Sequence, residues 1–242
     1  INTEVSARSL AGPWRMAGSM RVDGMRSAIT VNTGRGRDGG MRLRIQAEPD
    51  VQKIALDLDG ELRFKDGASA KYAGDFRLSA RRDQQDGAAA PESSPGFRTK
   101  GTFELDDQRL VLDTFRFETG PLDNPYHAEG RGDVDFGAEP RFSLTLDGAQ
   151  VRFDEAIGAG DSTGLTLADR LSALQEAFLD LPKPSIPGTL EVNLPAVVAG
   201  DTTIRDVRFS AEPAANGWKI ESLAATLPGR AKLEADGLLR TD

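Results

Sequence analysis

The most regular feature of the sequence is a strict alternation of apolar and polar residues in short runs. In an extended chain successive side chains point to opposite faces, so each run places its apolar side chains on one face of a strand. Six runs share the form glycine-polar-apolar-polar-apolar, and the leading glycine predicts a turn at the start of each strand. These glycines are Gly18, Gly60, Gly74, Gly101, Gly132 and Gly188.

The alternating runs fill most of the chain. They occupy residues 18–80, resume at Phe97 and return from Gly188 to the end. Turn signals separate the runs, chiefly Asp-Gly pairs at 23–24, 38–39, 59–60 and 66–67. Short strands divided by Asp-Gly turns are typical of an antiparallel meander. We therefore expect an all-β, mainly antiparallel fold of about fifteen strands, counted from these runs.

Two segments depart from the alternation. Residues 81–96 contain no large apolar residue, which predicts a flexible loop. Near 165–181, apolar residues recur every three or four positions, which predicts one amphipathic helix ended by Pro182 and Pro184. The expected organisation is one continuous β domain made of a meander at 1–80, the loop, a second meander at 97–160, a helix with a Pro-rich connection at 161–186, and β structure at 187–242.

One helix cannot cover the apolar face of so many strands. Fifteen strands side by side would span about 70 Å, whereas a sixteen-residue helix is about 24 Å long. Either the strands split into two sheets that pack as a sandwich, or one curled sheet lines a groove that a ligand fills. From the pattern alone the sandwich is favoured, because sandwiches are commoner among all-β folds.

The composition of the chain excludes some classes of binding partner and of protein. The net charge is −8 with a pI near 4.9, which argues against a nucleic-acid partner. The chain has no cysteine and no apolar stretch that approaches the length of a membrane-spanning helix. Ile1 is not a typical native start, so we expect the chain to be a fragment or a processed product of a larger protein.

The sequence offers little catalytic or metal-binding chemistry. Its single histidine, His127, is expected to be a turn or strand-end residue, and no Gly-x-Ser-x-Gly elbow is present. Gly34, Gly36 and Gly39 match a dinucleotide motif formally, but a strand pattern follows them, which indicates a hairpin loop. Asp57-x-Asp59-Gly60 begins like a calcium loop without its later ligands. We expect no enzyme, no metal and no cofactor, although a glycan-active carboxylate pair is a minor alternative.

Several motifs, taken in order, resemble one family. They include Leu10-Ala-Gly-Pro-Trp14, Ile29-Thr-Val-Asn-Thr-Gly34, Tyr72-Ala-Gly-Asp-Phe76, Phe136-Gly-Ala-Glu-Pro-Arg-Phe142 and Leu227-Pro-Gly-Arg-Ala-Lys-Leu233. Their order is similar to that in the AsmA-like proteins of Gram-negative bacteria, relatives of TamB and YhdP, and most like alphaproteobacterial members. The resemblance covers most of the chain.

The resemblance implies a curled β-sheet with an apolar interior that shelters phospholipid acyl chains on their way between the inner and outer membranes. It implies a periplasmic segment of a protein anchored in the inner membrane by an N-terminal helix, with no catalytic residues. The alternative is a non-catalytic sandwich that acts as a scaffold or interaction module in outer-membrane protein assembly. The residues expected to line the lipid groove are Leu43, Ile45, Leu56, Leu58, Phe103, Leu105, Leu144 and Leu146.

Overall fold

The computed structural model describes residues 2–7, 13–22, 25–36, 39–50, 54–64, 70–80, 97–119, 125–152, 166, 184 and 186–240. Apart from one short 3-10 turn, Pro228–Arg230, every regular element in these ranges is a strand. The strands are β1 (Asn2–Ala7), β2 (Trp14–Val22), β3 (Met25–Arg35), β4 (Met41–Pro49), β5 (Ile54–Phe64), β6 (Ala70–Ala80), β7 (Arg98–Leu105), β8 (Arg109–Thr119), β9 (Tyr126–Asp135), β10 (Arg141–Gly148), β11 (Gln150–Arg152), β12 (Gly188–Ala199), β13 (Thr202–Ala214), β14 (Gly217–Thr226) and β15 (Lys232–Arg240). The predicted all-β class and the number of strands are confirmed.

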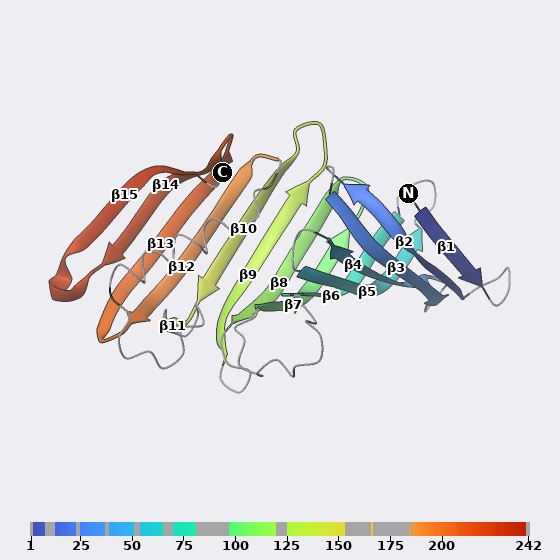
Figure 1. The fold of residues 1–242 in the computed structure, drawn as a ribbon, viewed down its shortest axis with the longest axis horizontal. Helices are drawn as coiled ribbons and strands as arrows, with labels where there is room; N and C mark the ends of the chain where they lie inside the picture. Colours follow the sequence, from blue (N-terminus) through green and yellow to red (C-terminus); the bar gives the residue numbers. More distant parts are fainter. Residues whose placement is uncertain are drawn as a thin grey trace. The chain divides into compact units, whose positions relative to one another are not determined.

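The chain divides into two compact units, which we describe separately. The first comprises residues 1–89 and 97–115, and the second comprises residues 90–96 and 116–242. In the first unit, β1 to β7 and the start of β8 are hydrogen-bonded in the order in which they occur along the chain (Figure 1). The pairs from β1–β2 to β6–β7 are all antiparallel. This is the predicted meander, which short connections favour.

The second unit contains one reversal of this pattern. Its order is the end of β8, then β9, β10, β12, β13, β14 and β15, and β11 pairs with β12. β10 and β11 each run parallel to β12, whereas the other pairs in this unit whose register is defined are antiparallel. Parallel neighbours require a long connection, and the chain supplies one between Arg152 and Gly188. The helix predicted near 165–181 and the loop predicted at 81–96 lie outside the described residues, Thr166 excepted.

The structure corrects the role predicted for the leading glycines. Gly18, Gly60, Gly74, Gly101 and Gly132 lie inside β2, β5, β6, β7 and β9, and only Gly188 begins a strand. In particular, Asp59-Gly60 is not a turn, because β5 continues through it from Ile54 to Phe64. The physical reason is that each interior glycine occupies the alternating position that apolar residues occupy elsewhere in the same strand.

Another predicted turn is present. Gly39 has a φ of 83°, a left-handed conformation that suits glycine, between the ends of β3 and β4. The backbone N–H of Gly36 donates to the carbonyl oxygen of Gly40 at 3.0 Å, which closes this connection. The match to a dinucleotide motif is therefore a hairpin loop, as predicted.

Candidate functional site

The register divides the first unit into two chemically different faces. Residues that pair directly across an antiparallel ladder point to the same face. Ile45 pairs with Leu58, Leu58 pairs with Phe76, and Leu43 pairs with Gly60. This places the six groove residues predicted in this unit on one face. We call it the unit 1 apolar face, and it includes Val31, Leu43, Ile45, Leu56, Leu58, Tyr72, Phe76, Phe103 and Leu105.

The aromatic part of this face is packed. Phe103, Tyr72, Phe76 and Phe115 are only 2%, 4%, 6% and 8% exposed. The rings of Tyr72 and Phe103 meet edge to face with centroids 4.8 Å apart, and those of Phe76 and Phe115 do so at 6.3 Å. Edge-to-face contacts add to the stability that burial provides. Sequence reasoning missed Tyr72, Phe76 and Phe115 as members of this cluster.

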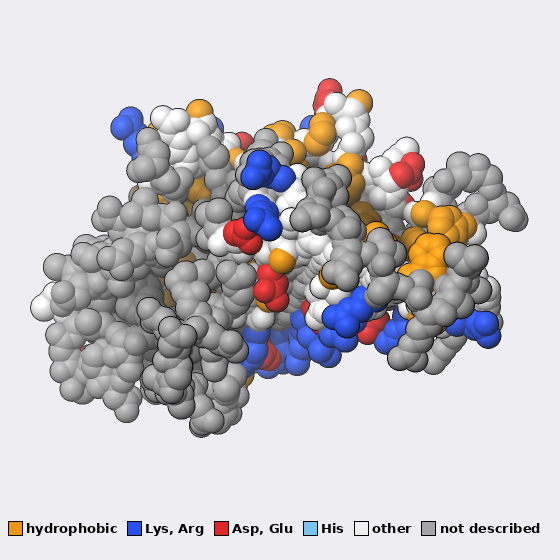
Figure 2. All heavy atoms as spheres, turned by 45° about the vertical axis from the view of Figure 1, so that its right-hand side comes forward, with side chains coloured by type: hydrophobic (Ala, Val, Ile, Leu, Met, Phe, Trp, Pro, Cys, Tyr) orange, Lys and Arg blue, Asp and Glu red, His pale blue; other side chains and the backbone are white. Residues whose placement is uncertain are grey.

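The aliphatic part of the same face is only half covered. Leu43, Ile45, Leu56 and Leu58 on β4 and β5 are all half-buried. At the end of β5, Phe64 is 72% exposed, and Trp14 at the start of β2 is 43% exposed. Figure 2 shows hydrophobic side chains open to solvent in this way. The four aliphatic side chains on β4 and β5 therefore form the least covered part of the unit 1 apolar face, and apolar surface that protein leaves open is where an apolar partner can bind.

Tyr72 ties three strands together across the apolar face. It stands on β6, its ring lies over Gly60 on β5, and its hydroxyl donates to the carbonyl oxygen of Leu43 on β4 at 2.9 Å. Burial raises the pKa of Tyr72 to about 12, and the charges of Asp59 and Asp57 add to the shift. The hydroxyl therefore remains a neutral donor across the physiological range.

Interior glycines let neighbouring strands of unit 1 approach closely on the apolar face. A Cβ placed on Gly74 would meet the backbone of Asp59 and Gly60, and one on Gly101 would lie 2.7 Å from the Cα of Phe115. Real Cβ atoms essentially never approach other heavy atoms within 3.0 Å. On the opposite face, a Cβ on Gly34 would meet Arg42 at an ordinary 3.7 Å. A side chain at Gly74 or Gly101 would therefore force the neighbouring strands apart on the apolar face.

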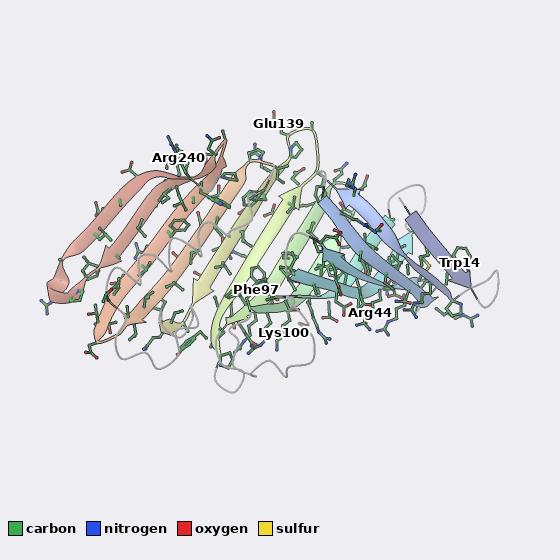
Figure 3. All side chains as sticks on the ribbon, viewed as in Figure 1. Trp14, Arg44, Phe97, Lys100, Glu139 and Arg240 are labelled. Carbon is green, nitrogen blue, oxygen red and sulfur yellow. The ribbon has the colours of Figure 1, made fainter. Side chains whose placement is uncertain are left out.

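The opposite face of unit 1 is covered by ion pairs. Arg42 and Arg44 on β4 each form a two-bond pair with a carboxylate on β5, Arg42 with Asp59 (3.1 and 2.9 Å) and Arg44 with Asp57 (2.9 and 2.5 Å). The hydrogen bond from Arg42 lowers the pKa of Asp59. Lys71 and Glu104 pair at 2.5 Å on the next two strands. Figure 3 shows the side chains of Arg44 and Lys100 projecting away from the strands. In Figure 2, basic side chains (blue) and acidic side chains (red) lie next to one another on the surface.

The second unit repeats the two-faced arrangement. Leu144 on β10 pairs with Gly132 on β9 and with Leu190 on β12, and Leu146 pairs with Val192. Across β12 and β13, Val192 pairs with Phe209. The two groove residues predicted in this unit therefore share one face, which we call the unit 2 apolar face. It includes Val134, Phe142, Leu144, Leu146, Leu190, Val192, Val207, Phe209, Ala211, Trp218 and Ile220.

The other face of unit 2 is polar. Arg131, Asp133, Thr145, Asp147, Glu191 and Asn193 project there, and the Asn193 side-chain amide donates to Asp147 at 2.9 Å. In the parallel pair, a Cβ on Gly188 would collide with the ring and carbonyl oxygen of Phe142. The absence of a side chain at Gly188 therefore leaves room for the Phe142 ring on the unit 2 apolar face.

The described ranges show no candidate metal centre. They contain no group of three or more His, Asp or Glu side chains placed to hold a metal ion. His127 is the second residue of β9, a strand-end position as predicted. The calcium-loop reading of Asp57 and Asp59 is excluded, because both lie within β5 and pair with arginines. The described part of the chain also holds no helix long and apolar enough to cross a bilayer.

Comparisons of the chain with protein-family models, with curated proteins and with solved structures found no match. The candidate site is therefore described from the structure alone. In each unit it is the apolar face of the sheet, and the opposite face is polar.

Proposed function

We propose that the two apolar faces bind the acyl chains of lipids, and that the chain is a non-catalytic segment of an AsmA-like bridge that moves phospholipid between the inner and outer membranes. The observation that carries the proposal is the row of half-buried aliphatic side chains at Val31, Ile45 and Leu58, which pair directly across β3, β4 and β5 on the unit 1 apolar face. Acyl chains need apolar contact and no specific polar partner.

The energetics of such a face suit a lipid tail. Each methylene group removed from water contributes about 0.8 kcal/mol. Three or four neighbouring strands carry enough aliphatic side chains to contact a tail along much of its length, because strands lie about 4.8 Å apart. The polar face of each unit, with its ion pairs, remains suited to water.

In this role the chain lies in the periplasm. It belongs to a longer protein held in the inner membrane by an N-terminal anchor, and it contributes to outer-membrane biogenesis. The motifs that resemble the AsmA-like family support this placement. The ligand is phospholipid or another acyl lipid, and no nucleic acid or enzymatic step is involved.

A photo-crosslinking experiment tests the proposal. The amino acid benzoyl-phenylalanine is introduced at Leu58, on the unit 1 apolar face, and separately at Asp57, its neighbour on the polar face. The protein is expressed in the periplasm of a Gram-negative host, irradiated, purified and analysed by mass spectrometry. Lipid adducts are expected at position 58 and not at position 57. Equal labelling at both positions, or protein free of lipid after organic extraction, would contradict the proposal.

One observation favours a second candidate. The aromatic side chains of Tyr72, Phe76, Phe103 and Phe115 already fill part of the unit 1 apolar face with their own contacts. A face filled throughout in this way would serve a scaffold or interaction module in outer-membrane protein assembly. In that case neither crosslinker position yields lipid, and position 58 yields protein adducts or none.

A further inference from the structure

In the described strands β2 to β7, the unit 1 apolar face carries one charged residue, Arg35. The register assigns uncharged residues to every other position of this face in these strands. Arg35 is the last residue of β3, and it pairs with Met41, the first residue of β4. The single charge therefore stands at an end of the face, where the strands meet water.

The side chain of Arg35 is accessible and has no counter-ion on its own face. It is exposed, and no ion pair or hydrogen bond joins its guanidinium group to the described residues. Its neighbours on the face, Thr33 on β3 and Met41 on β4, carry no charge. At the same end of β5, the carboxylate of Glu61 lies on the polar face and pairs with Arg63 at 2.7 Å. The positive charge of Arg35 is thus available to an anion from solution.

The same end of the apolar face is open to a ligand. Trp14 begins β2 and is 43% exposed (Figure 3), and Phe64 ends β5 and is 72% exposed. The register puts both residues on the apolar face at the end where Arg35 lies. Farther along β4, Leu43 and Ile45 are half-buried on this face. One ligand can therefore contact apolar side chains and an accessible cation from the same side.

We propose that Arg35 binds the phosphate of a phospholipid whose acyl chain lies over the aliphatic side chains of the unit 1 apolar face. The inference rests on the proposed function and adds to it the headgroup contact and the direction of the bound lipid. A guanidinium group donates two parallel hydrogen bonds to a phosphate, and such charge-assisted bonds are stronger than neutral ones. A ligand that is apolar along most of its length and anionic at one end matches this face.

The spacing along the strands agrees with this direction. A strand rises about 3.3 Å per residue, so Leu43 and Ile45 lie about 7 and 13 Å along β4 from Met41, the partner of Arg35. An acyl chain that begins beside Arg35 passes over both side chains. The phosphate remains at the end of the strands, where water can hydrate its other oxygens.

Three probes that separate the head from the tail test the inference. Decyl phosphate carries both parts, decyl glucoside has the same tail with an uncharged head, and inorganic phosphate is the head alone. Isothermal titration calorimetry of the chain, below the concentrations at which the probes form micelles, measures each affinity. We expect decyl phosphate to bind about tenfold more tightly than decyl glucoside, as hydrogen bonds to a charged group allow. Inorganic phosphate should bind more weakly than decyl phosphate.

A matched pair of substitutions shows whether Arg35 is responsible. Arg35→Gln removes the charge and keeps a polar side chain, so it should abolish the preference for decyl phosphate and leave the affinity for decyl glucoside within about twofold. Arg42→Gln removes the same charge near the same end of the strands, but from the polar face, and should keep the preference. Equal loss of the preference in both variants would indicate a general effect of net charge and would overturn the inference.

A measurement on the unsubstituted chain tests the direction of the ligand. In protein labelled with carbon-13 at the methionine methyl groups, Met41 reports on the position directly across from Arg35. Its methyl group should show nuclear Overhauser contacts with the O–CH2 protons of decyl phosphate and not with the terminal methyl group. Contacts with the terminal methyl group alone would mean that the ligand lies the other way round, and the inference would be wrong.

Failure of the inference differs from failure of the proposed function. If the two decyl probes bind with equal affinity, acyl binding stands and the assignment of Arg35 is wrong. If inorganic phosphate binds as tightly as decyl phosphate, the tail contributes nothing, which contradicts both. If neither decyl probe binds, both fail as well.

Discussion

At the scale of single residues, the glycines carry more structural information than the large apolar side chains. Gly60 and Gly74 pair directly across β5 and β6, and a Cβ on either would enter the backbone of the neighbouring strand. We expect Gly74→Ala to destabilise the protein by about 1–3 kcal/mol, the usual effect of forcing atoms into a packed site. Urea unfolding followed by circular dichroism measures the change.

The matched control is Gly34→Ala on the opposite face. The added Cβ would lie 3.7 Å from the Cβ of Arg42, an ordinary contact. We expect the free energy of unfolding to change by no more than about 0.5 kcal/mol. Equal effects at the two glycines would show that the strands are not packed more closely at Gly74 than at Gly34.

The hydroxyl of Tyr72 gives a prediction about pH. Its pKa is raised to about 12 in the folded protein, mainly by burial. Because the folded pKa lies above the unfolded value of about 10, neutral Tyr72 contributes stability that is fully present below pH 10 and is lost as the pH rises through 12. An ultraviolet titration of tyrosinate should show one of the two tyrosines ionising near pH 12. Tyr72→Phe should remove that transition and Tyr126→Phe should retain it.

At the scale of strands, the alternation of apolar and polar residues predicted correctly which face each groove residue occupies. It predicted less well where some strands end. Met41–Pro49 alternates as expected, and each predicted groove residue shares its unit's apolar face. The strand ends were misjudged because Asp-Gly is a common turn sequence. The signal that identifies Gly60 as interior is its phase, since Leu58, Gly60 and Leu62 occupy successive positions of one face. Gly74 stands in the same phase between Tyr72 and Phe76.

Other features of the strands had no signal in a single sequence. The parallel pairing of β10 with β12 depends on a long-range contact between segments whose local patterns suit either direction. Local alternation predicts which face a residue occupies, but it does not predict the strand that will be its neighbour.

The ion pairs between β4 and β5 allow a prediction for a pair of neighbouring strands. The hydrogen bond from Arg42 lowers the pKa of Asp59, so Asp59 contributes stability above its unfolded pKa that is lost as the pH falls through its folded pKa. We expect Arg42→Gln to return this pKa toward the usual range of aspartate. Carbon-13 NMR of the carboxylate during an acid titration measures it. Arg26→Gln, which removes the looser 3.9 Å pair with Asp50, should leave Asp59 unchanged.

At the scale of the whole molecule, the question is whether the apolar faces are filled by protein or by ligand. Each unit has one apolar and one polar face, and the described strands of each unit follow a single hydrogen-bonded order rather than two separate sheets. The two units share this arrangement although one is a simple meander and the other contains parallel pairs. An apolar face backed by a polar face is the ordinary pattern of a sheet with one covered side, so the arrangement fits a cover of protein as well as one of ligand.

Leu144→Asp distinguishes the two possibilities. Leu144 is half-buried on the unit 2 apolar face. In a closed protein core, an unpaired carboxylate there would cost several kcal/mol and unfold the protein. On a face that a mobile acyl chain covers, the carboxylate can reach water when the ligand leaves, so the variant should fold and lose lipid. Circular dichroism and lipid recovery by mass spectrometry report the two properties separately.

The control for this variant is Thr145→Asp, one residue along on the polar face. Thr145 pairs with Arg131 on one side and Glu191 on the other, so an added carboxylate meets one charge of each sign. We expect this variant to fold and to retain lipid at the wild-type level. Loss of folding in Leu144→Asp alone would support the self-filled scaffold. Loss of lipid without loss of folding would support a face that ligand covers. A ligand can leave, so a charge at position 144 is tolerated by the fold and still prevents the lipid from binding.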